Sequence, residues 1–264
     1  MSDAVEKNPW DGLKAFTNAR IALGRAGNAL PTAPLLAFNL SHAQARDAVH
    51  QPLDTEALRR ALEAEGFATL EVASAAPDRQ HYLRRPDLGR CLSEASRAVL
   101  AAQPAASAEA APEVVFVVGD GLSAFAAAKQ AVPLLKAART RLDGWRIGPV
   151  VIARQARVAL GDEIGELLGA SLVAMLIGER PGLSSPDSLG IYLTWAPKVG
   201  CHDAQRNCIS NVRPEGLPHE AAAHKLHYLL TQARRLKLTG VGLKDDSDAL
   251  PGTNREVPGA IAPP

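Results

Sequence analysis

Residues 114–121 read Val-Val-Phe-Val-Val-Gly-Asp-Gly, and this stretch decides the fold. Its first five residues are β-branched or aromatic, which favours a strand, and the glycines that follow predict a tight turn. An alanine-rich segment with helical spacing comes next. Because a continuously apolar strand is buried on both faces, this strand, turn and helix are typical of a parallel sheet covered by helices.

The same pattern recurs through the second half of the chain. Apolar runs at residues 150–152, 172–177 and 191–195 predict three further strands. Residues 220–236 predict a closing helix with arginines near its end. We therefore expect an α/β fold whose residues 113–247 form a Rossmann-like domain with a doubly wound, mainly parallel sheet.

The first hundred residues carry helix signals instead. Apolar residues between Pro9 and Leu23 recur at roughly helical spacing, which predicts a first helix. Residues 35–49 predict a second helix, and residues 54–66 predict a third that begins at an aspartate cap. We expect residues 1–100 to form a helical N-terminal region.

Two segments outside these regions have compositions of their own. Residues 101–112 are low in complexity and lack a large apolar side chain that could anchor them, which predicts a linker. Residues 248–264 are rich in Pro and Gly and predict a disordered tail. Before the linker, Val72 is expected to lie in a short extended piece.

Composition narrows the classes of partner and compartment. The 29 Lys and Arg residues nearly balance 28 Asp and Glu residues, so no basic field attracts nucleic acid. The N-terminus lacks a secretory pattern, and the strongest apolar run, 172–177, is too short to span a membrane. None of Cys91, Cys201 and Cys208 forms a C-x-x-C pair. We expect a soluble cytoplasmic protein with reduced thiols.

In such a sheet, ligands approach the loops beyond the carboxyl ends of the strands. The candidate binding loops are residues 119–121, 154–162, 178–187 and the segment after Trp195. Gly119-x-Gly121-x-x-Ala124 matches a relaxed dinucleotide fingerprint, but Asp120 would place a negative charge beside the phosphates. A turn that packs internally is the leading interpretation of this motif, and ligand contact is the second.

Glu179 occupies a position typical of a binding site, because it follows a buried strand in a loop dense with turn residues. Its carboxylate could accept hydrogen bonds from a polar ligand, or it could pair with Arg180 or Arg154. Cys208 alone is interpreted as a small buried thiol. Together with Cys201 and His202 it does not complete a set of four zinc ligands, so we expect no metal site.

His42, Arg46 and His50 are spaced four residues apart and would lie on one helix face. Two turns place the histidines about 12 Å apart, which is too far for them to share a metal ion. The stripe is interpreted as facing a partner or the solvent.

Several long and unusual strings run between residues 8 and 246. They are residues 8–10, 17–27, 41–50, 82–90, 153–163, 178–188 and 207–216. Together they resemble the small, or light, subunit of ethanolamine ammonia-lyase. The resemblance implies a chain that is inactive alone and assembles with a large barrel subunit, which holds the substrate. It implies the conversion of ethanolamine to acetaldehyde and ammonia, started by homolysis of the cobalt–carbon bond of adenosylcobalamin.

The resemblance also implies which residues contact the cobalamin between the two subunits. Val158 would make an apolar or backbone contact, Glu179 would accept hydrogen bonds from corrin amides, and Cys208 would fit a tight apolar surface. No catalytic residue is implied in this chain. Some relatives carry a longer N-terminal extension suited to a bacterial microcompartment, and only a few residues precede Asn8 here. We therefore do not expect encapsulation.

Two other hypotheses stay open at the level of sequence. The Gly119–Gly121 turn and the parallel-sheet pattern are compatible with a stand-alone Rossmann-like enzyme that binds a nucleotide or a phosphate ester. The polar face from His42 to His50 is compatible with a scaffold that docks a partner. Copurification with a barrel subunit and an assay for cobalamin dependence distinguish the three.

Overall fold

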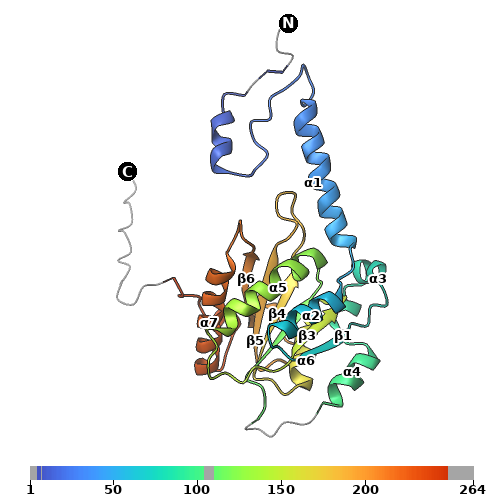
Figure 1. The fold of residues 1–264 in the computed structure, drawn as a ribbon, viewed down its shortest axis with the longest axis vertical. Coiled ribbons are helices and arrows are strands. Elements are labelled where there is room, and N and C mark those ends of the chain that lie inside the picture. The colour runs from blue at the N-terminus through green and yellow to red at the C-terminus, as the bar shows by residue number, and fades with distance from the viewer. Residues whose placement is uncertain (1–4, 7, 104–109, 249–264) are drawn as a thin grey trace, which may run out of the picture.

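The computed structural model describes residues 5–6, 8–103 and 110–248, and these build one six-stranded sheet with helices around it (Figure 1). The strand order is β1-β3-β2-β4-β5-β6. The strands are β1 (Thr69–Ala73), β2 (Val114–Gly119), β3 (Val150–Arg154), β4 (Leu172–Gly178), β5 (Leu189–Trp195) and β6 (Arg206–Val212). Residues 104–109 of the predicted linker, 101–112, and residues 249–264 of the predicted tail, 248–264, lie outside the described residues.

The helices precede, connect and follow the strands. The α-helices are α1 (Thr32–His50), α2 (Thr55–Ala64), α3 (Arg79–Arg84), α4 (Glu94–Ala101), α5 (Ala124–Arg139), α6 (Leu160–Leu167) and α7 (His219–Leu236). Short 3-10 helices are η1 (Asp11–Phe16), η2 (Leu88–Arg90), η3 (Asp203–Gln205) and η4 (Gly240–Gly242). The predictions of α1, α2 and α7 are confirmed, and Asp54 caps α2 by accepting a hydrogen bond from the Ala57 N–H.

The sheet is mixed. Strands β1, β3, β2 and β4 are mutually parallel, whereas β5 runs antiparallel to β4 and β6 antiparallel to β5. The ten-residue connection 179–188 explains the reversal, because it is too short to hold a crossover helix between parallel neighbours. The α/β class is therefore confirmed, with a sheet that is mostly parallel and ends in two antiparallel pairs.

Helices cover both faces of the sheet and bury two apolar clusters. On one face Phe116 belongs to a cluster with residues of α2, α5 and α7. On the other face Val115 and Val117 belong to a cluster with residues of α4 and α6. Every residue of β2 is buried, as its unbroken apolar run predicts.

The N-terminal hundred residues divide into two parts. Strand β1 lies at the edge of the sheet beside β3, and α2 packs over it, so residues 55–73 contribute to the main core. Residues before α1 form only the short η1 where a longer helix was predicted, and that prediction is wrong. Its physical reason is the lack of a packing surface: Phe16 is 86% exposed, and a helix without a buried face is marginal in water.

The turn after β2 is held from inside the protein. The buried Asp120 carboxylate accepts hydrogen bonds from the backbone N–H groups of Gln155 and Ala156, each at 2.9 Å. It also pairs with Arg79 at 3.4 Å. These bonds join the loops after β2 and β3 and turn this carboxylate away from any phosphate role, which favours the packing interpretation of the glycine motif.

Gly121 lies in the same turn, and its replacement tests how closely the turn packs against Gly178. It has φ +54°, and a Cβ there would lie 2.3 Å from the carbonyl oxygen of Gly178. We expect Gly121→Ala to lower the free energy of unfolding by about 2 kcal/mol, from backbone strain and overpacking together. Gly144→Ala is the control, because Gly144 has φ +74° but open space around it. Equal losses for both variants in urea denaturation would show that the close approach to Gly178 costs nothing.

Candidate functional site

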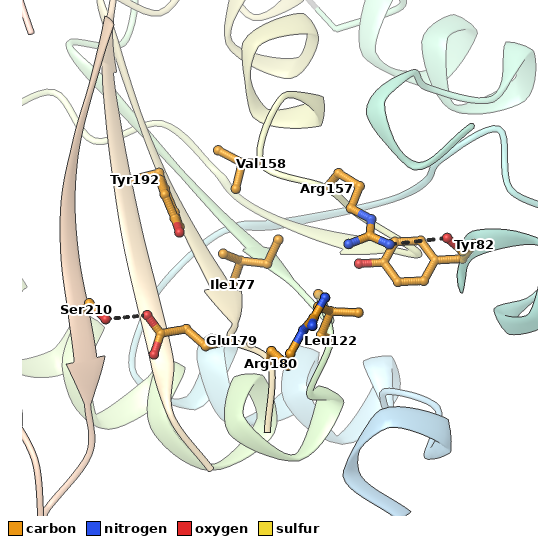
Figure 2. A pocket seen from close by; sticks show the side chains of 11 residues that line it. Tyr82, Leu122, Arg157, Val158, Ile177, Glu179, Arg180, Tyr192 and Ser210 are labelled. Atoms are coloured by element: carbon orange, nitrogen blue, oxygen red, sulfur yellow. Dashed lines mark hydrogen bonds between the residues drawn. The ribbon is translucent and has the colours of Figure 1, made fainter. Parts of the chain in front are cut away.

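An open pocket of about 440 Å³ lies at the carboxyl ends of the parallel strands (Figure 2). Its lining residues are Tyr82, Gly121, Leu122, Arg157, Val158, Ile177, Gly178, Glu179, Arg180, Tyr192 and Ser210. Three of the four predicted binding loops, 119–121, 154–162 and 178–187, therefore meet here. Sequence reasoning assigned no role to Tyr82, Tyr192 or Ser210, although Tyr82 and Ser210 lie within the strings that carried the resemblance.

The fourth predicted loop is displaced by the reversal of β5. Trp195, the last residue of β5, pairs with Leu172, the first residue of β4. Strand β5 therefore ends at the amino ends of the parallel strands, opposite the pocket. The chain then continues through residues 199–203, which line a second pocket of about 490 Å³. Arg157 and Val158 line both pockets, so the two hollows adjoin at the loop before α6.

Glu179 is held by hydroxyl and amide donors. Ser188 Oγ donates to Oε2 at 2.5 Å, Ser210 Oγ donates to Oε1 at 2.7 Å, and the Asn211 N–H donates to Oε2 at 3.3 Å. Gly190 leaves room for the carboxylate, because a Cβ there would lie 3.0 Å from Oε1. A carboxylate offers about four acceptor sites, so one stays available for a ligand in the pocket.

The alternative interpretation of Glu179 as an ion-pair partner is wrong. Arg154 pairs with Glu71 at 3.3 Å. Within the described part of the chain, no basic side chain lies within ion-pair distance of Glu179, and Arg180 is exposed. The carboxylate therefore remains an acceptor whose position is fixed by neutral donors.

Cys208 lies on β6 directly across from Tyr192 of β5. The thiol is exposed, so its interpretation as a buried core residue is wrong. The neighbouring side chains still desolvate it, and this desolvation, with the charge of Glu179, raises the pKa of Cys208 above its ordinary value. A thiol that stays protonated is a poor nucleophile, which favours a contact role over a chemical one.

Val158 forms part of an apolar floor between the two sides of the pocket. It is partly buried and packs against the core cluster under α6. Figure 2 shows Val158 and Ile177 between Glu179 on one side and Arg157 on the other. Of the three predicted cofactor contacts, Val158 and Glu179 thus line one pocket, and Cys208 lies beside it next to Tyr192.

Tyr82 forms the wall opposite Glu179. Its ring is fully buried, and its hydroxyl donates to the Ala156 carbonyl at 3.0 Å. The guanidinium of Arg157 lies over the ring, 4.3 Å from its centroid, and that of Arg79 lies 4.7 Å away. Tyr82 therefore fixes the loop after β3 and the side chain of Arg157 together.

The raised pKa values of Tyr82 and Tyr192, which line the pocket, predict that the protein loses stability at alkaline pH. Desolvation raises the pKa of Tyr82 and of Tyr192 to about 12, from 10.0. The unfolded phenols lose their protons first, so the stability that these groups contribute is complete below pH 10 and is lost as pH rises toward about 12. Urea denaturation at stepped pH, with phenolate absorbance alongside, measures this loss. Tyr192→Phe should flatten the decline, and an unchanged slope would contradict the assignment for Tyr192.

The polar stripe on α1 lies on the surface. His42, Arg46 and His50 are all exposed, and His42 stacks on Phe38 with ring centroids 6.4 Å apart. Figure 1 shows α1 extending away from the sheet. Within the described ranges, no helix combines the length and the apolar character needed to cross a membrane.

Known relatives cover nearly the whole chain. Residues 7–244 match the family described as ethanolamine ammonia-lyase light chain (EutC). The chain is 56% identical over 246 residues to the ethanolamine ammonia-lyase small subunit of Ralstonia nicotianae, covering 92% of this chain and 91% of the relative. It is 54% identical over 252 residues to the small subunit of Azotobacter vinelandii, with 94% and 93% covered.

A third relative gives the same result. The chain is 53% identical over 250 residues to the ethanolamine ammonia-lyase small subunit of Pseudomonas aeruginosa, covering 94% of this chain and 91% of the relative. The resemblance inferred from the strings in the sequence is therefore confirmed. This chain belongs to the ethanolamine ammonia-lyase light-chain family.

Proposed function

We propose that this chain is the small subunit of an adenosylcobalamin-dependent ethanolamine ammonia-lyase. The assembled enzyme, a lyase, converts ethanolamine to acetaldehyde and ammonia by a radical mechanism, and the cobalamin lies between this chain and the large barrel subunit. One observation carries the proposal. Val158 and Glu179, which belong to separate loops of a light-chain family member, line a single pocket at the carboxyl ends of the parallel strands.

The side chains of the pocket fit a corrinoid. A corrin ring has an apolar periphery that carries amide side chains. Val158 and Ile177 supply the apolar surface, and Glu179 has an acceptor site for an amide N–H. Cys208 adds a small, protonated contact at the edge. The chemistry of these residues supports the proposed contacts.

The size and openness of the site favour a second polypeptide. A corrinoid is much larger than the drug-sized ligands that pockets of a few hundred Å³ enclose. This chain would therefore cover one side of it and the large subunit the other. The N-terminal part also exposes large apolar side chains, among them Trp10, Phe16, Leu36 and Leu40, as expected of a surface that a partner covers.

The chain's own contribution is binding and orientation. Adenosylcobalamin, when bound, supplies the radical chemistry through its cobalt–carbon bond. Glu179, Val158 and Cys208 would hold the cofactor in place, and we assign no catalytic residue to this chain. We place the assembled enzyme in the cytoplasm. We also propose that residues 113–247 form a Rossmann-like, doubly wound domain, supported by the helices on both faces of the parallel strands.

Reconstitution tests the proposal. We expect this chain alone to release no ammonia from ethanolamine, and the chain with its large subunit to release it only when adenosylcobalamin is added. Activity of the lone chain on a nucleotide or phosphate ester would favour the stand-alone enzyme instead. Ammonia release that does not depend on cobalamin, or none from a well-assembled complex, would refute the assignment.

A further inference from the structure

Arg157 is a partly buried cation without a counter-charge. Its Nη2 donates to the carbonyl oxygen of Tyr82 at 3.4 Å, and its Nε is buried without a hydrogen-bond partner. Among the described residues, no carboxylate lies within ion-pair distance of it and no acceptor contacts Nη1. Burying a charge is unfavourable unless an opposite charge compensates it, so the position suggests an anion that arrives with a ligand.

The neighbouring Arg79, by contrast, has a carboxylate that compensates its charge. Arg79 lies over the same tyrosine ring, but its Nη1 is 3.4 Å from the buried Asp120 carboxylate. Its Nε also donates to the Val49 carbonyl at 2.6 Å. Arg79 Nη2 is also buried without a hydrogen-bond partner, but the charge of Arg79 is compensated by Asp120, whereas Arg157 has no such carboxylate among the described residues and lines the pocket.

The conformation of Arg157 is fixed in advance of any ligand. Its backbone N–H donates to the Gly89 carbonyl at 2.8 Å, and its guanidinium lies 4.3 Å from the Tyr82 ring centroid. A side chain at Gly89 would meet both residues, because a Cβ there would lie 2.8 Å from Arg157 Cγ. A guanidinium held in this way loses little conformational entropy when it binds an anion.

A second guanidinium lines the same pocket. Arg180 is exposed and, within the described residues, makes no ion pair. Figure 2 shows Arg157 and Arg180 on one side of Ile177 and Glu179 on the other side. The pocket thus has a carboxylate on one side, an apolar floor and two cations on the other side.

This division specifies a ligand with three chemical parts: amide donors, an apolar body and an anionic group. We propose that Arg157, assisted by Arg180, binds the phosphodiester of the cobalamin nucleotide tail. The inference rests on the proposed function, since it assumes that the corrinoid occupies this pocket. Arginine suits the role because its planar fork of N–H donors matches phosphate oxygens.

Three corrinoids that differ in the tail test the proposal by equilibrium dialysis with the assembled two-subunit complex. Hydroxocobalamin carries the phosphodiester, cobinamide phosphate carries the phosphate alone, and cobinamide carries neither. We expect the complex to bind the first two about 10- to 100-fold more tightly than cobinamide. Arg157→Gln should remove most of the preference for cobinamide phosphate over cobinamide, because only Arg180 then remains beside the phosphate, and it should leave the affinity for cobinamide itself unchanged. Arg157→Lys should recover part of the difference.

The controls separate this role from a structural one. Arg180→Gln should give a smaller loss in the same direction, and it probes an exposed residue that makes no ion pair within the described residues. Arg235→Gln, at an exposed position on α7, should change nothing. Equal weakening of all three corrinoids by Arg157→Gln would mean that Arg157 supports the fold or pairs with the large subunit, and the inference would be overturned. So would a wild-type complex that binds cobinamide phosphate no better than cobinamide. A complex that binds no corrinoid at all would instead refute the proposed function.

Discussion

Asp162→Ala will lower the free energy of unfolding by about 3–5 kcal/mol, because it removes the buried counter-charge of Arg206 and leaves only an exposed carboxylate beside it. Asp162 of α6 and Arg206 of β6 form a bidentate pair at 2.5 and 2.7 Å, and their side chains are 1% and 2% exposed. Arg206 also donates to the Thr194 hydroxyl and the Cys201 carbonyl. Urea denaturation of the variant and the wild type measures the difference.

Asp203→Ala is the matched control, because Asp203 lies 3.5 Å from the Nε of the same arginine but is fully exposed. We expect little or no loss of stability for this variant, because water screens the charge of an exposed carboxylate. Similar losses for the two aspartates would mean that burial of the Asp162 pair is unimportant.

The ion pair between Asp162 and Arg206 also joins α6, the helix that follows Val158, to β6, the strand that carries Cys208 and Ser210. Asp162→Ala should therefore weaken cobalamin binding in proportion to its effect on folding.

Glu179→Ala is expected to lower the affinity of the assembled enzyme for cobalamin by about 10- to 100-fold. This range corresponds to the loss of a hydrogen bond to a charged acceptor. Equilibrium dialysis with hydroxocobalamin measures the change directly, without relying on turnover. Glu179→Gln should lose less, since its carbonyl oxygen keeps one acceptor in place.

Two controls make the Glu179 result interpretable. Glu220→Ala removes a carboxylate that is 73% exposed, pairs with Arg141 and does not line the pocket, and it should leave the affinity unchanged. Urea denaturation of Glu179→Ala shows whether the loss of its three internal donors also destabilises the protein. Unchanged cobalamin affinity in a stable, assembled Glu179→Ala variant would remove this residue from the site.

The sequence was most informative where burial dictates composition. The runs at 114–118, 150–152 and 172–177 are strands because only apolar, mostly β-branched segments fit between two layers of helices. Strand β6 went unpredicted because it lies at the sheet edge, where Asn207, Ser210 and Asn211 are tolerated. Composition does not predict the direction of a strand either. The connection before β5 has only ten residues, however, and this length predicted that β5 runs antiparallel to β4.

The candidate site was partly predictable for a similar reason. Glu179 could be placed because it follows a buried strand, and the loops after parallel strands gather at one edge. Tyr192 and Ser210 could not, because they reach the pocket through the antiparallel pairing of β5 with β6. Arg157 looked like one of many loop arginines, and only the structure shows that it lines the pocket over Tyr82 without the carboxylate that Arg79 has. The domain boundary near residue 100 stays a prediction.

The order of the strands has a consequence for the newly synthesised chain. Strand β1 cannot pair until β3 has been made, about eighty residues later, whereas β4, β5 and β6 follow one another through short connections. Contacts between segments close in sequence form faster than distant ones. The side of the pocket that contains Glu179 should thus form quickly, but only late in translation. A product that stops before Ser210 would retain the parallel strands, yet the hydroxyl that secures Glu179 from β6 would be missing.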